Sequence, residues 1–345
     1  MRKNILINSD ICHDTIVKEM QPKLGFNKDL NFVSWKKDVL EKFTEIIGMK
    51  SVLDNSCPLN FEIEWEEDKG DYKLIRFTVD SEVGETVPCY LTIPKLGKEK
   101  YPVVIVLQGH DGAINCSIGE PKNEKQEKFV SSSGDFALQA VRNGYIGFAV
   151  ELRGIGEKQP VSENRASDVT CRWATRTAFF LQRTIVAERI VDIMKAIDAL
   201  SNFSVCDLDK IAITGNEIGG VTAFYTACLD ERIKLCAPNG GFCNFADSLF
   251  VDERCGCYYI PYLFEQMDMQ DLSCLVAPRD LLILAPEKDK NNPLESVKKS
   301  FEIAKSIFSL AGAKENCNIV TTPSSSWDKE AVWQALNNKF EKLGW

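Results

Sequence analysis

The spacing of hydrophobic residues changes twice along the chain. Within the first 60 residues, apolar side chains such as Phe32, Trp35, Val39 and Phe43 recur at helical spacing between charged residues. This pattern predicts an amphipathic helix lying on the main domain. From Phe61 the period becomes two, which predicts the antiparallel edge of a sheet. The predicted edge strands are Phe61–Trp65, Leu74–Val79 and Val87–Ile93.

The remainder of the chain alternates buried strands with helices. Val103–Leu107 is continuously apolar, as in a strand buried on both faces of a parallel sheet. The later predicted strands are Tyr145–Val150, Lys210–Thr214, Leu281–Leu284 and Asn318–Val320; the predicted helices are Asp135–Asn143, Arg183–Leu200, Gly219–Cys228 and Glu295–Leu310. The pattern predicts an α/β fold with a doubly wound, mostly parallel sheet. We expect a helical extension over 1–60, one α/β domain over 61–345 and a lid insertion over about 157–180.

Composition narrows the function classes. The 345 residues carry a net charge of −9 and no dense run of Lys or Arg, which argues against a nucleic-acid partner. No apolar stretch is long enough to predict a membrane span. The first 18 residues lack the apolar core of a signal peptide, so the 13 cysteines are expected to be reduced in the cytoplasm.

The cysteines give no zinc-site spacing in the sequence. Cys255 and Cys257 are close together, but no second pair accompanies them, and His13 and His110 are the two histidines of the chain. Most of the other cysteines, such as Cys228, lie in apolar runs and are expected to pack as small hydrophobic residues. The sequence therefore predicts neither a metal nor another cofactor.

The segment Ile213–Tyr225 carries a glycine pattern with chemical meaning. Gly215 and Gly219 flank Glu217 as glycines flank the serine in G-x-S-x-G, the sharp strand-to-helix turn called the nucleophile elbow. The segment resembles the elbow of the α/β-hydrolases, and within that superfamily the chain resembles the branch of acetyl xylan esterases and dienelactone hydrolases. The resemblance covers roughly residues 70–340 and extends to the stretches Val87–Pro94, Pro102–Gly112, Arg183–Leu200, Leu229–Ile233 and Asp271–Arg279.

The resemblance implies where a catalytic triad would lie. Glu217 occupies the nucleophile position, Asp289 matches the acid, and the alignment puts Ser325 at the histidine position. No histidine follows His110 in the sequence, so ordinary serine-esterase chemistry is excluded by residue identity. The backbone N–H groups of Ile218 and His110 are expected to form the oxyanion hole.

Three interpretations of Glu217 remain open. Glu217 is a general acid or base for a lyase, isomerase or cyclase reaction on a small acyl or carbonyl compound, with His110 as a proton partner. Alternatively, the protein is a pseudoenzyme that binds a ligand, and Glu217 is a carboxylate stabilised at a helix N-terminus. In the third interpretation Glu217 is the carboxylate nucleophile of an ester hydrolase. His110 can also serve through its backbone alone, and Asp289 as a loop cap.

The predicted lid supplies candidate ligand-binding residues. They are Arg172, Trp173 and Arg176, with Arg165 before them, and the arginines could clamp a carboxylate or phosphate of a small-molecule ligand. The alternative is that they form a basic, solvated surface. The sequence leaves open whether the chain forms a homo-oligomer.

Overall fold

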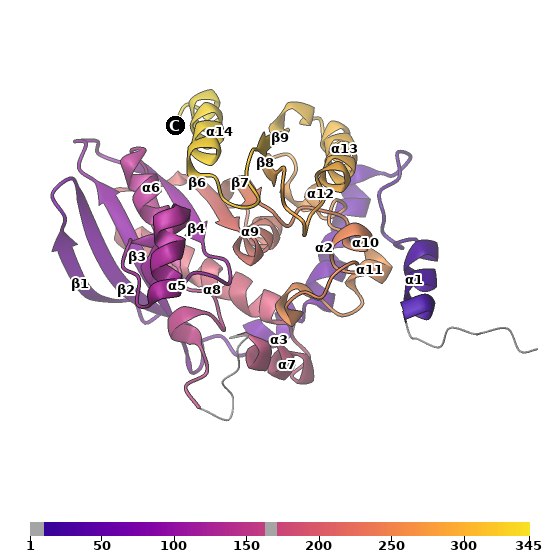
Figure 1. Cartoon of the computed structure of the whole chain (residues 1–345), viewed down its shortest axis with the longest axis horizontal. Coiled ribbons are helices and arrows are strands. Elements are labelled where there is room, and N and C mark those ends of the chain that lie inside the picture. The colour runs from indigo at the N-terminus through magenta and orange to yellow at the C-terminus, as the bar shows by residue number, and fades with distance from the viewer. Residues whose placement is uncertain (1–9, 163–170) are drawn as a thin grey trace, which may run out of the picture.

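A nine-stranded sheet forms the centre of the molecule (Figure 1). The computed structural model describes residues 10–162 and 171–345. The strand order is β1-β2-β3-β5-β4-β6-β7-β8-β9; β1, β2 and β3 pair antiparallel, β3 pairs antiparallel with β5, and the strands from β5 across to β9 are parallel. The strands are β1 Glu62–Asp68, β2 Tyr72–Glu82, β3 Glu85–Pro94, β4 Tyr101–Leu107, β5 Ile146–Val150, β6 Cys206–Asn216, β7 Ile233–Asn239, β8 Asp280–Pro286 and β9 Cys317–Thr322.

Helices cover both faces of this sheet. Alternate residues of β4 point to opposite sides, so that Ile105 belongs to the core beneath α8 and α9 while Val104 belongs to the core beneath α6 and α14. The α-helices that follow β4 are α4 Ile114–Ser117, α5 Glu124–Phe129, α6 Phe136–Arg142, α7 Arg172–Phe180, α8 Ile185–Ala199, α9 Ile218–Leu229, α10 Phe245–Ser248, α11 Leu263–Gln266, α12 Ser273–Val276, α13 Leu294–Leu310 and α14 Lys329–Leu343. The doubly wound α/β architecture predicted from the sequence is confirmed.

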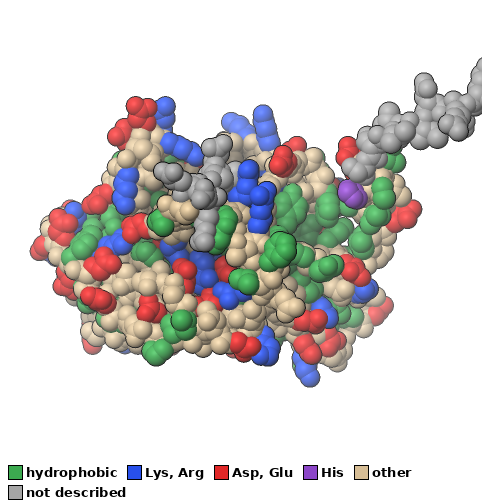
Figure 2. All heavy atoms as spheres, turned by 90° about the horizontal axis from the view of Figure 1, so that it is seen from below, with side chains coloured by type: hydrophobic (Ala, Val, Ile, Leu, Met, Phe, Trp, Pro, Cys, Tyr) green, Lys and Arg blue, Asp and Glu red, His purple; other side chains and the backbone are tan. Residues whose placement is uncertain are grey.

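The N-terminal part is helical, with α1 (Asp10–Glu19), α2 (Phe32–Ile46) and α3 (Met49–Leu53). As predicted from its spacing, α2 buries Trp35, Val39 and Phe43 against the main core. Helix α1 buries no side chain, and its apolar residues line a groove shared with α11 and the preceding loop. Figure 2 shows apolar side chains gathered at this end of the molecule.

The eight strands and four later helices predicted from periodicity are all present, with ends within four residues of the predicted ones. Strand β7 was not predicted. It follows α9 after a short turn. Its last five residues are Leu, Cys, Ala, Pro and Asn, a run too short and too mixed to show the period of a strand. None of the described helices is long and apolar enough to cross a membrane.

A buried network of charged side chains joins the antiparallel edge of the sheet to α8. Asp192 accepts hydrogen bonds from Arg153 (Nη2–Oδ1 2.8 Å), Lys158 (Nζ–Oδ2 2.6 Å) and Ser81 (Oγ–Oδ1 2.5 Å). Arg153 also forms an ion pair with Glu82 at 2.6 Å. Burial alone would raise the pKa of Asp192, but the charges of Lys158 and Arg153 outweigh it and hold the pKa at about 2.

We expect this network to make the protein sensitive to acid. Because the pKa of Asp192 is lower in the folded state than in the unfolded chain, its contribution is present above pH 4 and is lost as the pH falls toward 2. A shift from 3.8 to about 2 corresponds to roughly 2.5 kcal/mol of unfolding free energy. Urea unfolding of the native protein and of Asp192→Asn between pH 6 and pH 3 measures it: the variant should be less stable at pH 6, and its stability should fall less with acid. The exposed Asp209→Asn is the control. Equal acid dependence of native protein and Asp192→Asn would contradict the assignment.

Candidate active site

The turn between β6 and α9 has the conformation of a strained elbow. Glu217 has φ 53° and ψ −117°, an unfavourable backbone conformation for a residue with a side chain, and α9 begins at the next residue. The glycines predicted to flank it are needed for close packing. A Cβ at Gly219 would lie 2.4 Å from the carbonyl oxygen of Leu107, and one at Gly215 would lie 2.6 Å from that of Gly219. The elbow therefore places Glu217 at the carboxyl edge of the parallel strands, where ligands bind in open α/β sheets.

The carboxylate of Glu217 is half-buried against the loop that follows β4. A Cβ at Gly109 would lie only 3.2 Å from Oε2 of Glu217, so this loop touches the carboxylate directly. Burial raises the pKa of Glu217 and the charge of Asp111 raises it further, while His110 lowers it. The arrangement favours a carboxyl group that exchanges a proton closer to neutrality than an exposed glutamate does.

The predicted oxyanion hole involves the start of α9 and the loop after β4. Ile218 is the first residue of α9, and the first N–H groups of a helix have no partner one turn earlier. The loop carrying His110 lies against the same carboxylate. No distance in the structure tests the two N–H groups as a pair, so the oxyanion hole stays a prediction.

The predicted acid of the triad, Asp289, lies beside the elbow. A Cβ at Gly240 would be 3.5 Å from Oδ2 of Asp289 and 3.9 Å from the backbone nitrogen of Glu217. The Asp289 carboxylate accepts hydrogen bonds from the backbone N–H of Asn291 (2.8 Å) and from Nδ2 of Asn292 (2.8 Å), as in a loop cap.

The loop after β9 brings a neighbouring serine to the elbow. Ser325 is exposed, whereas Oγ of Ser326 lies 2.9 Å from Nδ2 of Asn216, the residue before Glu217. The same loop contacts the acid loop through the backbone of Ser324, whose carbonyl oxygen accepts the N–H of Lys288 at 2.9 Å. The placement of Ser325 at the histidine position stays a prediction, and Ser326 is the serine that the structure places beside the elbow.

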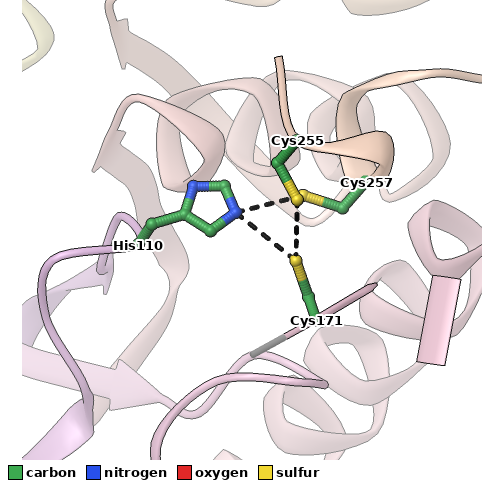
Figure 3. A group of neighbouring side chains, drawn as sticks. All are labelled: His110, Cys171, Cys255 and Cys257. Atoms are coloured by element: carbon green, nitrogen blue, oxygen red, sulfur yellow. Dashed lines mark hydrogen bonds between the residues drawn. The ribbon is translucent and has the colours of Figure 1, made fainter. Parts of the chain in front are cut away.

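The imidazole ring of His110 is directed at cysteine thiols (Figure 3). Its Nε2 lies 3.2 Å from Sγ of Cys257 and 3.5 Å from Sγ of Cys171. The Sγ atoms of Cys171 and Cys255 are 3.0 Å apart. These interactions occupy Nε2 of His110, the residue that the sequence analysis offered as a proton partner for Glu217.

The thiols and the imidazole shift one another's charge state. Burial opposes protonation of His110, but the contacts with Cys171 and Cys255 outweigh it and raise the pKa of His110 to about 9. The pKa of Cys255 is lowered by hydrogen bonding to Cys171 and Cys257, against burial that raises it. The group therefore favours at least one thiolate, the form in which cysteine binds metals.

The three candidate ligand-binding residues on α7 do not share one site. Arg172 and Arg176 line an open cleft of about 650 Å³ together with Glu253, Arg254 and Cys255. Trp173 lies on another side of the helix and lines a cavity with Arg153 and Lys158. Arg165 and the rest of 163–170 lie outside the described residues.

Arg254 is a site residue that the sequence analysis missed. Its charge lowers the pKa of Glu217, its guanidinium carbon lies 5.8 Å from the ring centre of Tyr258, and it donates a hydrogen bond to the carbonyl oxygen of Asn291. Its buried Nε has no hydrogen-bond partner among the described residues. An arginine in an irregular loop has no periodic pattern, so only the fold brings it to the elbow.

Comparisons with known proteins agree with this geometry. Residues 4–318 match the sequence profile of the Abhydrolase family. The chain is 22% identical over 298 residues to YtaP of Bacillus subtilis, which is named as a hydrolase, covering 85% of this chain and 95% of that protein.

Solved structures of esterases share the fold. A protein of Bacteroides fragilis named as an acetyl xylan esterase superposes with a TM-score of 0.76 at 16% identity, covering 93% of this chain and 84% of the other. A glucuronoyl esterase from Solibacter usitatus gives a TM-score of 0.67 at 16% identity, covering 90% and 92%. At such low identity these likenesses establish the fold alone.

Proposed function

Because the chain belongs to the Abhydrolase family, we propose that it is an enzyme of the α/β-hydrolase superfamily in which Glu217 replaces the nucleophilic serine and transfers protons on a small carbonyl compound. The observation that carries this proposal is the strained elbow. A conformation such as that of Glu217 costs about 1–3 kcal/mol and persists mainly where function requires it. A protein that only binds a ligand would gain nothing by holding a carboxylate in this way.

The proposed reaction is proton transfer at a carbon next to a carbonyl group. The carboxylate of Glu217 removes the proton, and the C–H electron pair moves into the carbonyl to give an enolate. The enolate oxygen is stabilised by the backbone N–H groups of Ile218 and His110. The protonated Glu217 then returns the proton to the other face of the same carbon once the enolate has turned, which gives an epimerase-type isomerase, or a leaving group departs from the next carbon, which gives a lyase.

The cleft lined by Arg172 and Arg176 supports an anionic substrate. Arg254 lines the same cleft, and its charge also lowers the pKa of Glu217, which relates the cleft to the elbow. A small carbonyl acid, such as a 2-oxo acid or a uronic acid, carries both the carbonyl that the mechanism needs and the charge that these arginines attract.

The geometry gives less support to the carboxylate-nucleophile alternative. The covalent intermediate formed on Glu217 would need a base to activate the hydrolytic water. The ring of His110 faces the thiols, and Asp289 is held by Asn291 and Asn292. Among the described residues, Glu217 itself is the group best placed to move a proton.

Solvent exchange tests the proposal. In D₂O, the purified protein is expected to catalyse deuterium incorporation next to the carbonyl of at least one member of a panel of 2-oxo acids and uronic acids, measured by proton NMR. Glu217→Gln should slow this exchange by about 10²–10⁴-fold, the usual contribution of a general base. Glu330→Gln, an exposed change on α14, is the matched control.

Other results would contradict it. Exchange that is unchanged in Glu217→Gln would remove Glu217 from the chemistry. Hydrolysis of 4-nitrophenyl acetate that is lost in Glu217→Gln, without exchange, would favour the nucleophile. Binding of panel members without exchange or hydrolysis would favour a pseudoenzyme.

A further inference from the structure

Four potential metal ligands converge beside the elbow, and their side chains take no part in the proposed proton transfer. The Nε2 atom of His110 and the Sγ atoms of Cys171, Cys255 and Cys257 all lie within 4.8 Å of one another. They come from three segments: the loop after β4, the residue before α7, and the short 3₁₀ turn at 256–258. Figure 3 shows the four side chains pointing toward one another.

The spacing of these atoms suits one tetrahedral ion. Bond lengths of about 2.3 Å to sulfur and 2.0 Å to nitrogen place tetrahedral ligands about 3.5–3.8 Å apart. The observed separations are 3.2 Å and 3.5 Å between His110 and two thiols, and 3.0 Å between Cys171 and Cys255. An iron–sulfur cluster, with several metal and sulfide atoms, would need a wider group of ligands.

This group differs from the other buried cysteines of the protein. Cys228, Cys236 and Cys274 lie in the hydrophobic core, as their apolar sequence surroundings predicted. Cys171 and Cys257 are equally buried, yet their sulfur atoms face another thiol or an imidazole nitrogen. Each of these polar groups loses its hydration when it is buried. A bound ion at the point toward which they are directed would compensate for that loss.

A buried arginine supplies an independent observation. Arg189 on α8 is fully buried and pairs with no carboxylate among the described residues; its hydrogen bonds go to the carbonyl oxygen of Arg153. The Nη1 atom of Arg189 has no hydrogen-bond partner among the described residues. Helix α8, which carries Arg189, packs against the 256–258 turn that holds Cys257. One divalent ion with three thiolates and a neutral imidazole carries a net charge of −1, which this cation would balance.

We infer that His110, Cys171, Cys255 and Cys257 bind one Zn²⁺ ion in a structural site. Three thiolates and one imidazole complete a tetrahedral shell and leave no position open for water or substrate, which is typical of structural rather than catalytic zinc. The ion ties the loop of His110 and the start of α7 to the 255–257 segment, so it fixes the segments that surround Glu217. The imidazole of His110 is used by the metal, and its backbone N–H stays available to an oxyanion.

Metal content tests this inference independently of any activity. The full-length protein, produced in zinc-supplemented medium and purified with a thiol reductant, is expected to contain about one zinc per chain by elemental analysis. Cys171→Ser and Cys257→Ser should each reduce this content to roughly a tenth or less under the same dialysis. Cys57→Ser, which alters a thiol outside the group, is the matched control and should keep the metal.

A second measurement covers variants that fold poorly. The native chain is stripped with a chelator under reducing conditions and titrated with Co²⁺ alone. Tetrahedral cobalt–thiolate bands in the visible and near-ultraviolet, saturating at about one equivalent, are expected. His110→Asn should weaken binding while circular dichroism shows an intact fold.

Three results would overturn the inference. The reduced native protein could take up neither Zn²⁺ nor Co²⁺. The zinc content could be the same in native protein and both cysteine variants, which would place the metal elsewhere. The unreduced native protein could lose two titratable thiols with no bound metal, and peptide mapping could join Cys171 to Cys255, which would make the pair a disulfide.

Discussion

The double variant Glu217→Ser with Ser326→His is expected to hydrolyse 4-nitrophenyl acetate at least about 10²-fold faster than Glu217→Ser alone. The reason is that the elbow, the acid position and the presumed oxyanion donors all remain in place, and only the nucleophile and its base are missing. Triad residues act as a unit, so a serine without a histidine gains little. Initial rates of nitrophenolate release measure the effect.

The structure selects position 326 for the histidine. Oγ of Ser326 is hydrogen-bonded to the residue before Glu217, whereas Ser325 is exposed. The loop also contacts the acid loop through Lys288 and Ser324. A histidine at 326 is therefore placed between the elbow and Asp289, as a triad requires.

Two further variants sharpen this experiment. Glu217→Ser with Ser325→His should give a smaller gain, which tests the alignment made from the sequence. Asp289→Asn in the active double variant should remove much of the gain, because the acid orients the imidazole. If neither histidine position raised the rate above that of Glu217→Ser, the site would not be a hydrolase triad with two exchanged residues. The proposal that Glu217 replaces a nucleophilic serine would then lose its support.

The sequence predicted the elements and the elbow, because their signals lie in residues that are neighbours along the chain. Periodic apolar residues marked the strands and the long helices, because burial on one or two faces imposes a period on neighbouring residues. The elbow was visible for a similar reason: Gly215 and Gly219 are required by contacts of a few ångströms with adjacent backbone. Glu217 could thus be placed before the fold was known.

The thiol group escaped the sequence analysis because its spacing is not local. Cys171 lies 61 residues after His110 and 84 before Cys255, and only the packing of α7 beside the 3₁₀ turn brings them together. The sequence did contain a signal. Cys255 and Cys257 are close together, and one of the two histidines of the chain, His110, lies in the loop next to the elbow. Searching for a second Cys pair was too narrow, since single ligands from separate segments can complete a site.

Removing zinc is expected to lower the melting temperature of the reduced native protein by roughly 5–15 °C. The estimate follows from linkage: a ligand present at 1,000 times its Kd stabilises the folded state by about 4 kcal/mol, and each kcal/mol corresponds to a few degrees for a domain of this kind. This prediction depends on the metal site and not on the proposed reaction. Differential scanning calorimetry before chelation, after chelation and after zinc is restored measures it.

The loss of stability should also have a location. Without the ion, the loop of His110, the start of α7 and the 255–257 segment lose the bond that ties them together, so their backbone amides should exchange with deuterium faster, while amides of β6 and β8 in the central sheet should change little. Cys171→Ser should melt at the same temperature with and without chelator, and Cys57→Ser should respond as the native protein does. A native melting temperature that chelation leaves unchanged would show that these four side chains hold the segments together without a metal.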